Sequence, residues 1–573
     1  MEQFFKRILV LEACGAIATH LWLQRSEPSS LLLVSSVLAL VPFFPFLVFS
    51  PSLASPISGM FLSYSVYSVT LATSVVAYRI SPLHPLSQHP GPLMCKITKL
   101  WGVWVALKGD THLYHKLLHD KYGPTVRIGP NELSTIDKDF IPFVLGSQGM
   151  PKGQLWDGRR FAQAKNGNEY DSLIDVRDLQ IHAQLRKAWN KAFAPSSMHD
   201  YEEFLDPRVA QLGDHLAHAC KDGSGHLVHV DLAKWISFFA FDLMGDIAFG
   251  GCFELMRDGD KEGLWKNMES GLYLPSITQH VPWIAVALRS LPFFGSGMQA
   301  LTQFGVFHAK RRAALEMKNK DLFYHLLEAS NTSSTSVEEQ FPIIVGNAIL
   351  TIVAGSDTTA SVMSSIICYL LSHPDVYKRL RDELDHAFPY VDADGVPVIE
   401  TEKLSSLNLL NAVINETLRL LPAIPTSLQR APARGSGGKM LGNSFFIPEG
   451  TGIQVPPYVL HRDPRYFSPD PEAFIPDRWL TPSKNGKDSQ APEFLTTKDA
   501  FIPFSYGPAN CAGKSLALTE MRAVITLLLK RFDLGFESKD SLEVQRVKWE
   551  SQMKDRFVFT KGKLPIWLKE RRL

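Results

Sequence analysis

The sequence Phe504-Ser-Tyr-Gly-Pro-Ala-Asn-Cys-Ala-Gly513 places one cysteine between a tight Gly-Pro turn and an apolar helical run over Lys514–Arg531. The N-terminus of a helix presents unpaired backbone N–H groups and the positive end of the helix dipole. Both features stabilise a thiolate relative to a thiol. The stretch therefore predicts an ionised, ligating sulfur at Cys511.

Cys511 has no second Cys or His at ligand spacing, which argues against a zinc site and against a CxxC redox pair. A lone thiolate suits an axial ligand of heme iron, where it pushes electron density toward O–O cleavage. Gly507 and Gly513 would let the backbone approach a flat macrocycle, and Phe504 would pack beside it. The alternative is a buried structural cysteine in a Pro/Gly loop.

The spacing Phe-x-x-Gly-x-x-x-Cys-x-Gly resembles the heme-binding loop of the cytochrome P-450 family. The resemblance implies a mainly α fold with small β-sheets, in which heme b lies between the cysteine helix and an earlier helix. One departure stands out. The family often has a basic residue two positions before the cysteine, in contact with a heme propionate, and this chain has Ala509. The propionate must then find other partners.

A second motif, Ala354-Gly-Ser-Asp-Thr-Thr359, lies in the middle of the largely apolar run 341–371. Its residues are poor helix formers, which predicts a helix that opens locally while a side-chain hydroxyl or water takes a backbone bond. The alternative, a transmembrane helix, is disfavoured by an aspartate at its centre. The run matches the family motif Ala/Gly-Gly-x-Asp/Glu-Thr-Thr/Ser, which implies heme contacts for Ala354 and Gly355 and a proton relay through Asp357 and Thr358.

Two further places offer partners to the propionates. In the helical segment 181–194, His182 and Arg186 are four residues apart and share one face. The matching helix of the family offers an aromatic residue or His, and an Arg, to a propionate. Arg430 is a third candidate. The alternative for the helix is a solvated basic face.

Glu416 and Arg419 are three residues apart on the helical run 404–421 and resemble the Glu-x-x-Arg pair of the family. The third member of that network is an Arg in a later loop, and Arg478 fits it. We expect a buried structural network rather than a catalytic one. An exposed helix pair is the alternative.

Three apolar stretches, 8–23, 31–49 and 58–78, occupy the N-terminal region. About twenty apolar residues cross a bilayer, so the last two qualify and the first is marginal. Basic residues flank the pair on both sides, and the link 50–57 has none. The positive-inside rule then favours a two-span hairpin with both flanks in the cytosol, and the first stretch either interfacial or spanning. Buried core helices are the alternative.

The resulting organisation has a membrane anchor over 1–80, a stiff and extended proline-rich hinge over 81–95 and a heme-thiolate catalytic domain over 96–573. The net charge of +1 gives no indication of nucleic acid. Six cysteines without disulfide or metal spacing indicate a reducing compartment. We expect the endoplasmic reticulum membrane, with the catalytic domain facing the cytosol.

The family resemblance implies a monooxygenase. The chain has no flavin or Rossmann phosphate loop, so electrons must come from a partner, NADPH–cytochrome P-450 reductase or alternatively cytochrome b5. Lys514 and other basic residues near the cysteine loop would dock it. The anchor and hinge are similar to those of fungal members of secondary metabolism, which favours a terpenoid or other lipophilic substrate. Two alternatives stay open, an isomerase or dehydratase without external reductant, and a non-catalytic heme-binding membrane protein.

Overall fold

The computed structural model describes most of the chain. The described residues are 2–571 apart from 26–30, 50–54, 160–171, 223–226, 252, 262, 283, 286–295, 315–319, 332–336, 391–396, 427 and 481–492. The sequence Pro-Phe-Phe-Gly at 292–295 predicts a break between two helical segments, and it lies outside the described residues.

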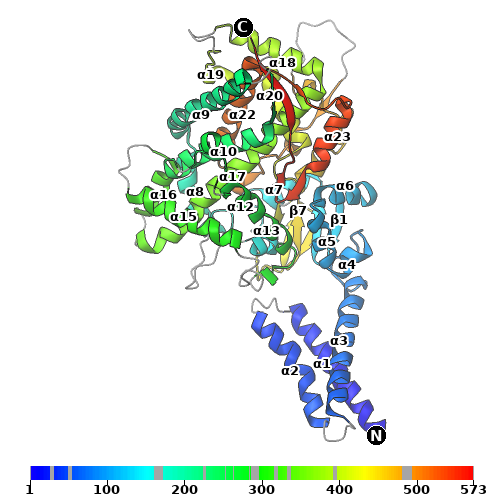
Figure 1. The fold of residues 1–573 in the computed structure, drawn as a ribbon. Coiled ribbons are helices and arrows are strands. Elements are labelled where there is room, and N and C mark those ends of the chain that lie inside the picture. Colours follow the sequence, from blue (N-terminus) through cyan, green and yellow to red (C-terminus); the bar gives the residue numbers. More distant parts are fainter. Residues whose placement is uncertain are drawn as a thin grey trace.

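Three N-terminal helices stand apart from the rest of the chain, below it in Figure 1. They are α1 (Glu2–Arg25), α2 (Leu31–Phe49) and α3 (Pro56–Ile80), and each packs against the other two. α2 covers the predicted stretch residue for residue and contains Pro42 and Pro45. By length and hydropathy Pro56–Ile80 suffices to cross a membrane, and Leu32–Val48 is a shorter apolar helix.

The remainder is mainly helical with small sheets, which confirms the expected fold class. Its first helices are α4 (Leu93–Ile97), α5 (Leu100–Lys108), α6 (Thr111–Tyr122), α7 (Ile141–Leu145), α8 (Leu179–Ala192), α9 (Pro195–Asp222), α10 (Leu232–Phe249), α11 (Leu255–Asp258), α12 (Leu264–Gly271) and α13 (Tyr273–Thr278). There follow α15 (Ser296–Ala314), α16 (Leu322–Asn331), α17 (Val337–Ser372), α18 (Pro374–Ala387), α19 (Thr401–Leu404), α20 (Asn408–Leu420), α21 (Pro457–Leu460), α22 (Lys514–Arg531) and α23 (Leu542–Gln552).

The largest sheet has four strands in the order β1-β2-β7-β4: β1 (Thr125–Gly129), β2 (Glu132–Thr135), β7 (Gly452–Gln454) and β4 (Gln429–Arg430). β1 and β2 form the hairpin that alternating apolar residues and turn signals predict, and β2 runs parallel to β7. A three-stranded sheet joins β10 (Phe532–Phe536), β13 (Pro565–Glu570) and β3 (Leu227–Asp231). The two-stranded pairs are β5 (Gly438–Leu441) with β6 (Phe445–Pro448), β8 (Phe467–Ser468) with β9 (Leu495–Thr496), and β11 (Lys554–Arg556) with β12 (Val558–Thr560).

The core of the catalytic part forms around α17. This helix packs on α10, α15, α16, α20, α22 and α23, and most of its apolar side chains from Ile344 to Leu371 are buried. Its length and hydropathy would also suit a membrane span. Since neighbouring helices bury most of it, α17 is a core helix of the folded domain.

The proline-rich hinge is not an extended linker. Residues 81–89 form a series of turns, and Leu86 and His84 are buried. The backbone N–H of Arg127 donates to the Pro90 carbonyl at 2.7 Å, and Arg79 at the end of α3 donates to the Ile97 carbonyl at 2.6 Å. The hinge is therefore docked onto β1 and α4, which fixes the direction in which α3 leaves the domain.

One expectation for the C-terminal region was wrong. The sequence after α22 predicts short strands up to Leu573. The structure has strands there, but it also has the helix α23 among them. Ser541 caps this helix by accepting a hydrogen bond from the Val544 N–H, and Trp549 buries its ring and donates to Ser365 in α17 at 3.2 Å. Tertiary packing of one aromatic residue thus decides the local structure.

A buried ionic network ties α20 to the 3-10 turn Pro476–Trp479. Both carboxylate oxygens of Glu416 accept from Arg419 at 2.8 Å, and Oε1 also accepts from Arg478 Nε at 3.0 Å. All three side chains are fully buried. Trp479 Nε1 donates to the same carboxylate at 2.9 Å. The structure therefore brings together the three residues that the family motif groups.

Replacing Glu416 by Ala should lower the free energy of unfolding by about 3–5 kcal/mol, because two buried guanidinium groups lose their counter-charge. Denaturant titration of the purified protein measures this. Arg379→Ala is the matched control, since Arg379 pairs with Asp477 of the same turn at 2.6 Å but on the surface. It should cost less than about 1 kcal/mol. Equal losses in the two variants would contradict the buried network.

Candidate functional site

Cys511 lies three residues before Lys514, the first residue of α22, at the end of the predicted loop. Its backbone N–H donates to the Phe504 carbonyl at 2.9 Å, which closes the loop. Gly507 has a φ of 72°, and an added Cβ would lie 2.3 Å from the Leu145 carbonyl oxygen. The loop can therefore pack on α7 only with glycine there. Cys511 itself is exposed.

Opposing effects act on the Cys511 sulfur. Although Cys511 is solvent-accessible, the surrounding protein desolvates the thiol and raises its pKa. The Gly513 N–H and the charges of Arg186 and Lys514 lower that pKa. Gly513 is not demanded by protein contacts, since an added Cβ would meet only the Phe193 ring at 3.6 Å. Its contact with a cofactor stays a prediction, as does that of Phe504, whose ring lies 5.7 Å from Lys514 Nζ.

The small polar motif of α17 lies within an unbroken helix. Thr358 Oγ1 donates to the Ala354 carbonyl at 2.5 Å, so a side-chain hydroxyl does take a backbone bond, but without opening the helix. Ala354 is exposed although Val353 and Ser356 are buried. The motif therefore presents one open position on an otherwise covered helix.

Gly355 faces the protein. An added Cβ would lie 2.1 Å from Met244 Sδ of α10, so the missing side chain is what lets α10 approach α17. The structure thus gives Gly355 a packing role, and its heme contact stays a prediction.

Asp357 is 5% exposed, and its Oδ1 has no hydrogen-bond partner within the part of the chain that the structure describes. Burial raises the pKa of its carboxyl, and the positive charge of Lys561 opposes this. Burial raises the pKa of Glu269 in α12 to about 7, and the negative charge of Asp357 contributes to this rise. The aspartate is therefore a buried acid next to the half-exposed Thr358.

His182, Arg186 and Arg430 converge although they come from α8 and β4. Burial, together with the positive charges of Lys152, Arg186 and Arg430, lowers the pKa of His182 to about 4. Arg186 also reaches the cysteine loop, where it donates to the Asn510 carbonyl at 2.5 Å and to Asn510 Oδ1 at 2.8 Å. Among the described residues none of the three forms an ion pair with a carboxylate. Together they create a site for an anion.

Residues 90–556 match the sequence profile of the family described as Cytochrome P450. The chain belongs to the cytochrome P450 family. Cytochrome P450 67 of Uromyces fabae is 32% identical over 86% of this chain and 87% of its own. The monooxygenase notG' of Aspergillus versicolor is 32% identical over 82% of this chain and 80% of its own. Tryprostatin B 6-hydroxylase of Aspergillus fumigatus is 30% identical over 89% of this chain and 85% of its own.

The protein is thus a cytochrome P450 monooxygenase, as the two sequence motifs predicted. Membership implies a heme-thiolate cofactor and a redox partner. The residues fit such a group, because the sulfur of Cys511 is exposed and the guanidinium of Arg186 bonds to the neighbouring Asn510. No cluster of three His, Cys, Asp or Glu side chains suited to a metal occurs in the described part of the P450.

Sequence reasoning missed Lys152, which joins the cationic group. It lies opposite Arg430 in an isolated antiparallel bridge, is 7% exposed and donates to the carbonyls of Leu173 and Ile174, both at 2.8 Å. Burial, with the nearby Arg430 charge, lowers its pKa to about 7. No local motif reveals Lys152, since the bridge joins segments far apart in the sequence.

Glu520 of α22 was also missed. Thr359 Oγ1 donates to Glu520 Oε1 at 2.9 Å, and Oε2 has no partner among the described residues. The side chain is 1% exposed, and burial raises its pKa to about 8. At neutral pH a protonated carboxyl therefore links the helix of Thr358 to the helix that follows Cys511.

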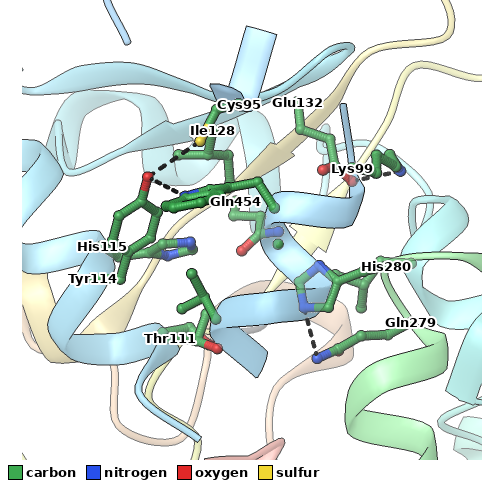
Figure 2. A pocket seen from close by; sticks show the side chains of 15 residues that line it. Cys95, Lys99, Thr111, Tyr114, His115, Ile128, Glu132, Gln279, His280 and Gln454 are labelled. Atoms are coloured by element: carbon green, nitrogen blue, oxygen red, sulfur yellow. Dashed lines mark hydrogen bonds and ion pairs between the residues drawn. The ribbon is translucent and has the colours of Figure 1, made fainter. Parts of the chain in front are cut away.

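A separate cavity of about 30 Å³ lies beside the hinge, between α4, α5, α6 and the loop that carries His280. Figure 2 shows the Tyr114 hydroxyl between Cys95 Sγ (3.3 Å) and Trp101 Nε1 (2.9 Å), with the Lys99–Glu132 ion pair nearby. This volume suits about two waters. Neither α17 nor the cysteine loop lines the cavity, so it is not the active site of the P450.

Proposed function

We propose that this protein is a membrane-anchored heme-thiolate monooxygenase that inserts one oxygen atom of O2 into a lipophilic substrate, using electrons from NADPH–cytochrome P-450 reductase. The observation that carries the proposal is the pairing of α22 with α17 through Thr359 and Glu520, since it puts the cysteine loop and the Asp357–Thr358 motif on two linked helices.

In this proposal Cys511 is the axial ligand of heme b. Its exposure supports the assignment, because a buried structural cysteine would be covered, as Cys368 is. The Phe504 carbonyl holds the loop, and the Gly513 N–H and Arg186 favour the thiolate. Bound heme with a thiolate ligand supplies the reductive activation of O2.

The heme propionates would take the anion site of His182, Arg186, Arg430 and Lys152. Arg186, Arg430 and Lys152 have no carboxylate partner among the described residues, and their mutual repulsion, which also keeps His182 neutral, would be relieved by two negative charges. Lys152 then supplies the positive charge that position 509 lacks. Two of its ammonium protons already bond to carbonyls, and the third remains for a propionate.

Asp357 and Thr358 would deliver protons. The buried Asp357 carboxyl, whose pKa is raised, can hold a proton near neutral pH and pass it to the adjacent Thr358 hydroxyl. Thr358 Oγ1 keeps its place by bonding to the Ala354 carbonyl, beside the exposed face of Ala354. The relay therefore ends beside Ala354, the exposed residue of the motif.

Exposed basic residues and the apolar N-terminal helices support the electron donor and the location that we propose. Lys514 is exposed at the first position of α22, next to the cysteine loop, and supports docking of an acidic reductase or of cytochrome b5 on this face. The apolar N-terminal helices support residence in the endoplasmic reticulum membrane with the catalytic part in the cytosol.

A terpenoid or another lipophilic secondary metabolite is the substrate class that we propose. One relative is named for the 6-hydroxylation of tryprostatin B, and others are named as fungal P450 monooxygenases. The identity and coverage make a related chemistry the best-supported one for this chain.

Replacing Thr358 by Ala should leave heme binding intact but uncouple electron use from oxygenation, lowering product per NADPH about tenfold or more, because the last proton donor is gone. Membranes supplied with reductase, NADPH and isotopically heavy O2 measure this by mass spectrometry on a panel of terpenes and fatty acids. Thr351→Ala is the matched control, since its hydroxyl bonds the Asn347 carbonyl in the same helix at 3.0 Å.

Two outcomes would overturn the assignment. Product that forms without NADPH, or without label from O2, would make the protein an isomerase or dehydratase. Equal coupling in Thr358→Ala and Thr351→Ala would remove the proton relay.

Replacing Lys152 by Met should speed the loss of heme to an apomyoglobin acceptor about tenfold or more, since one charge-assisted hydrogen bond to a propionate disappears. Absorbance spectra follow the transfer without any assay of activity. Lys439→Met serves as control, because Lys439 also donates to a backbone carbonyl, that of Gln148 at 2.8 Å, but is only half-buried and lies outside the group around His182. If both variants release heme at the wild-type rate, Lys152 is not a propionate partner.

A further inference from the structure

The polar residues of α1 face the interior of the N-terminal bundle. Glu12, Thr19 and His20 are 0%, 4% and 8% exposed. They recur at positions i, i+7 and i+8, which places them on one face of α1.

Each of the three meets a polar partner on α3. Ser63 contacts the Glu12 carboxylate, the Tyr67 hydroxyl donates to Thr19 Oγ1 at 2.9 Å, and His20 Nδ1 lies 2.7 Å from Ser74 Oγ. Ser63 also lies 3.2 Å from the Pro42 carbonyl of α2. A row of polar contacts thus runs along the axis of the bundle and touches all three helices.

The outer surface of the bundle is apolar. On α1 the exposed large side chains are Val10, Leu11, Ile17 and Leu21 (46–59% exposed). On α2 and α3 they include Leu32, Phe44, Val48, Ile57, Phe61 and Val69 (62–79% exposed). A water-soluble bundle has the opposite pattern, with apolar side chains inside. This one has its polar groups inside, as helices do when lipid surrounds them.

The pattern also excludes a surface-lying α1. A helix in the membrane interface turns its charged side to water and its apolar side to lipid. The buried carboxylate of Glu12 instead points at α3, and the exposed side of α1 is hydrophobic. With 24 residues, α1 is about 36 Å long, which is enough to cross the hydrocarbon core.

We propose that Glu2–Arg25 is a third membrane span, so that the anchor is a three-helix bundle whose outer surface contacts lipid acyl chains and whose polar row fixes the register of α1 on α3. An odd number of spans puts the N-terminus on the side of the membrane opposite the catalytic part, and in Figure 1 the N-terminus lies at the end of the bundle far from that part. Arg25, Arg79, Lys96 and Lys99 on the catalytic side then outnumber Lys6 and Arg7 on the other.

A glycosylation acceptor tag tests the topology on the full-length chain. Fused before Met1 and expressed in microsomes, the tag should be glycosylated, seen as a shift in gel mobility that an endoglycosidase removes. The same tag fused after Leu573 should stay unmodified. An unmodified N-terminal tag would overturn the third span, because a two-span anchor with an interfacial α1 keeps that end in the cytosol.

Oxidative cross-linking tests the polar row. In a Cys14→Ser background, Glu12→Cys with Ser63→Cys should form a disulfide that keeps α1 and α3 together after cleavage at a protease site inserted between α2 and α3. Leu11→Cys with Ser63→Cys is the matched control and should not cross-link, since Leu11 faces outward. Cross-linking of the control in place of the Glu12 pair would overturn the proposed packing.

Discussion

The hydrogen bond between Thr359 and Glu520 is the constraint on which the arrangement of the site depends. It joins α17 to α22 in a region where both side chains are almost completely buried. A charged carboxylate there would lack compensation, because Oε2 has no partner among the described residues. The raised pKa of Glu520 keeps the group neutral near pH 7, so the two helices are linked without a buried charge. On the other side of α17, the missing side chain of Gly355 admits Met244 of α10. The helix is thus held between two neighbours, and its open position falls at Ala354.

A second set of contacts holds the cysteine loop and the chain that precedes it. Gly507 seats it against α7, Arg186 bonds to Asn510, and the Glu416 network holds the preceding turn at Arg478. These contacts come from four separate stretches of the chain. These neighbours add to the constraint from the loop itself, which the hydrogen bond between the Cys511 N–H and the Phe504 carbonyl closes. An exposed sulfur in such a rigid setting is what a ligand to a bound group requires.

Much of this was readable from the sequence. α22 spans the predicted helical run Lys514–Arg531, and α2 spans the predicted uncharged run 31–49. The two motifs of the site each lie within ten consecutive residues, so local spacing reveals them. Lys152 and Glu520 were not predicted, because their partners, Arg430 and Thr359, are distant in sequence. The docking of the hinge was not predicted either, since its prolines indicate stiffness but not the strand against which it docks.

The choice between an interfacial and a spanning α1, which the sequence leaves open, depends on contacts between helices. Glu12 and His20 make its apolar stretch look too polar to span a membrane, and only their partners on α3 show that these groups are satisfied inside a bundle. Charge and hydropathy describe one helix at a time. Burial of polar groups between helices is a property of the assembled bundle.

The central claim is that the sulfur of Cys511 ligates heme iron. The reduced, carbon monoxide-bound difference spectrum of the purified holoprotein tests it most directly. The wild-type protein should show the Soret band of a thiolate-ligated heme, Cys511→Ser should lose it while retaining helical circular dichroism, and Cys368→Ser, which alters a buried cysteine of α17, should keep it. A thiolate Soret band that persists in Cys511→Ser would contradict the account.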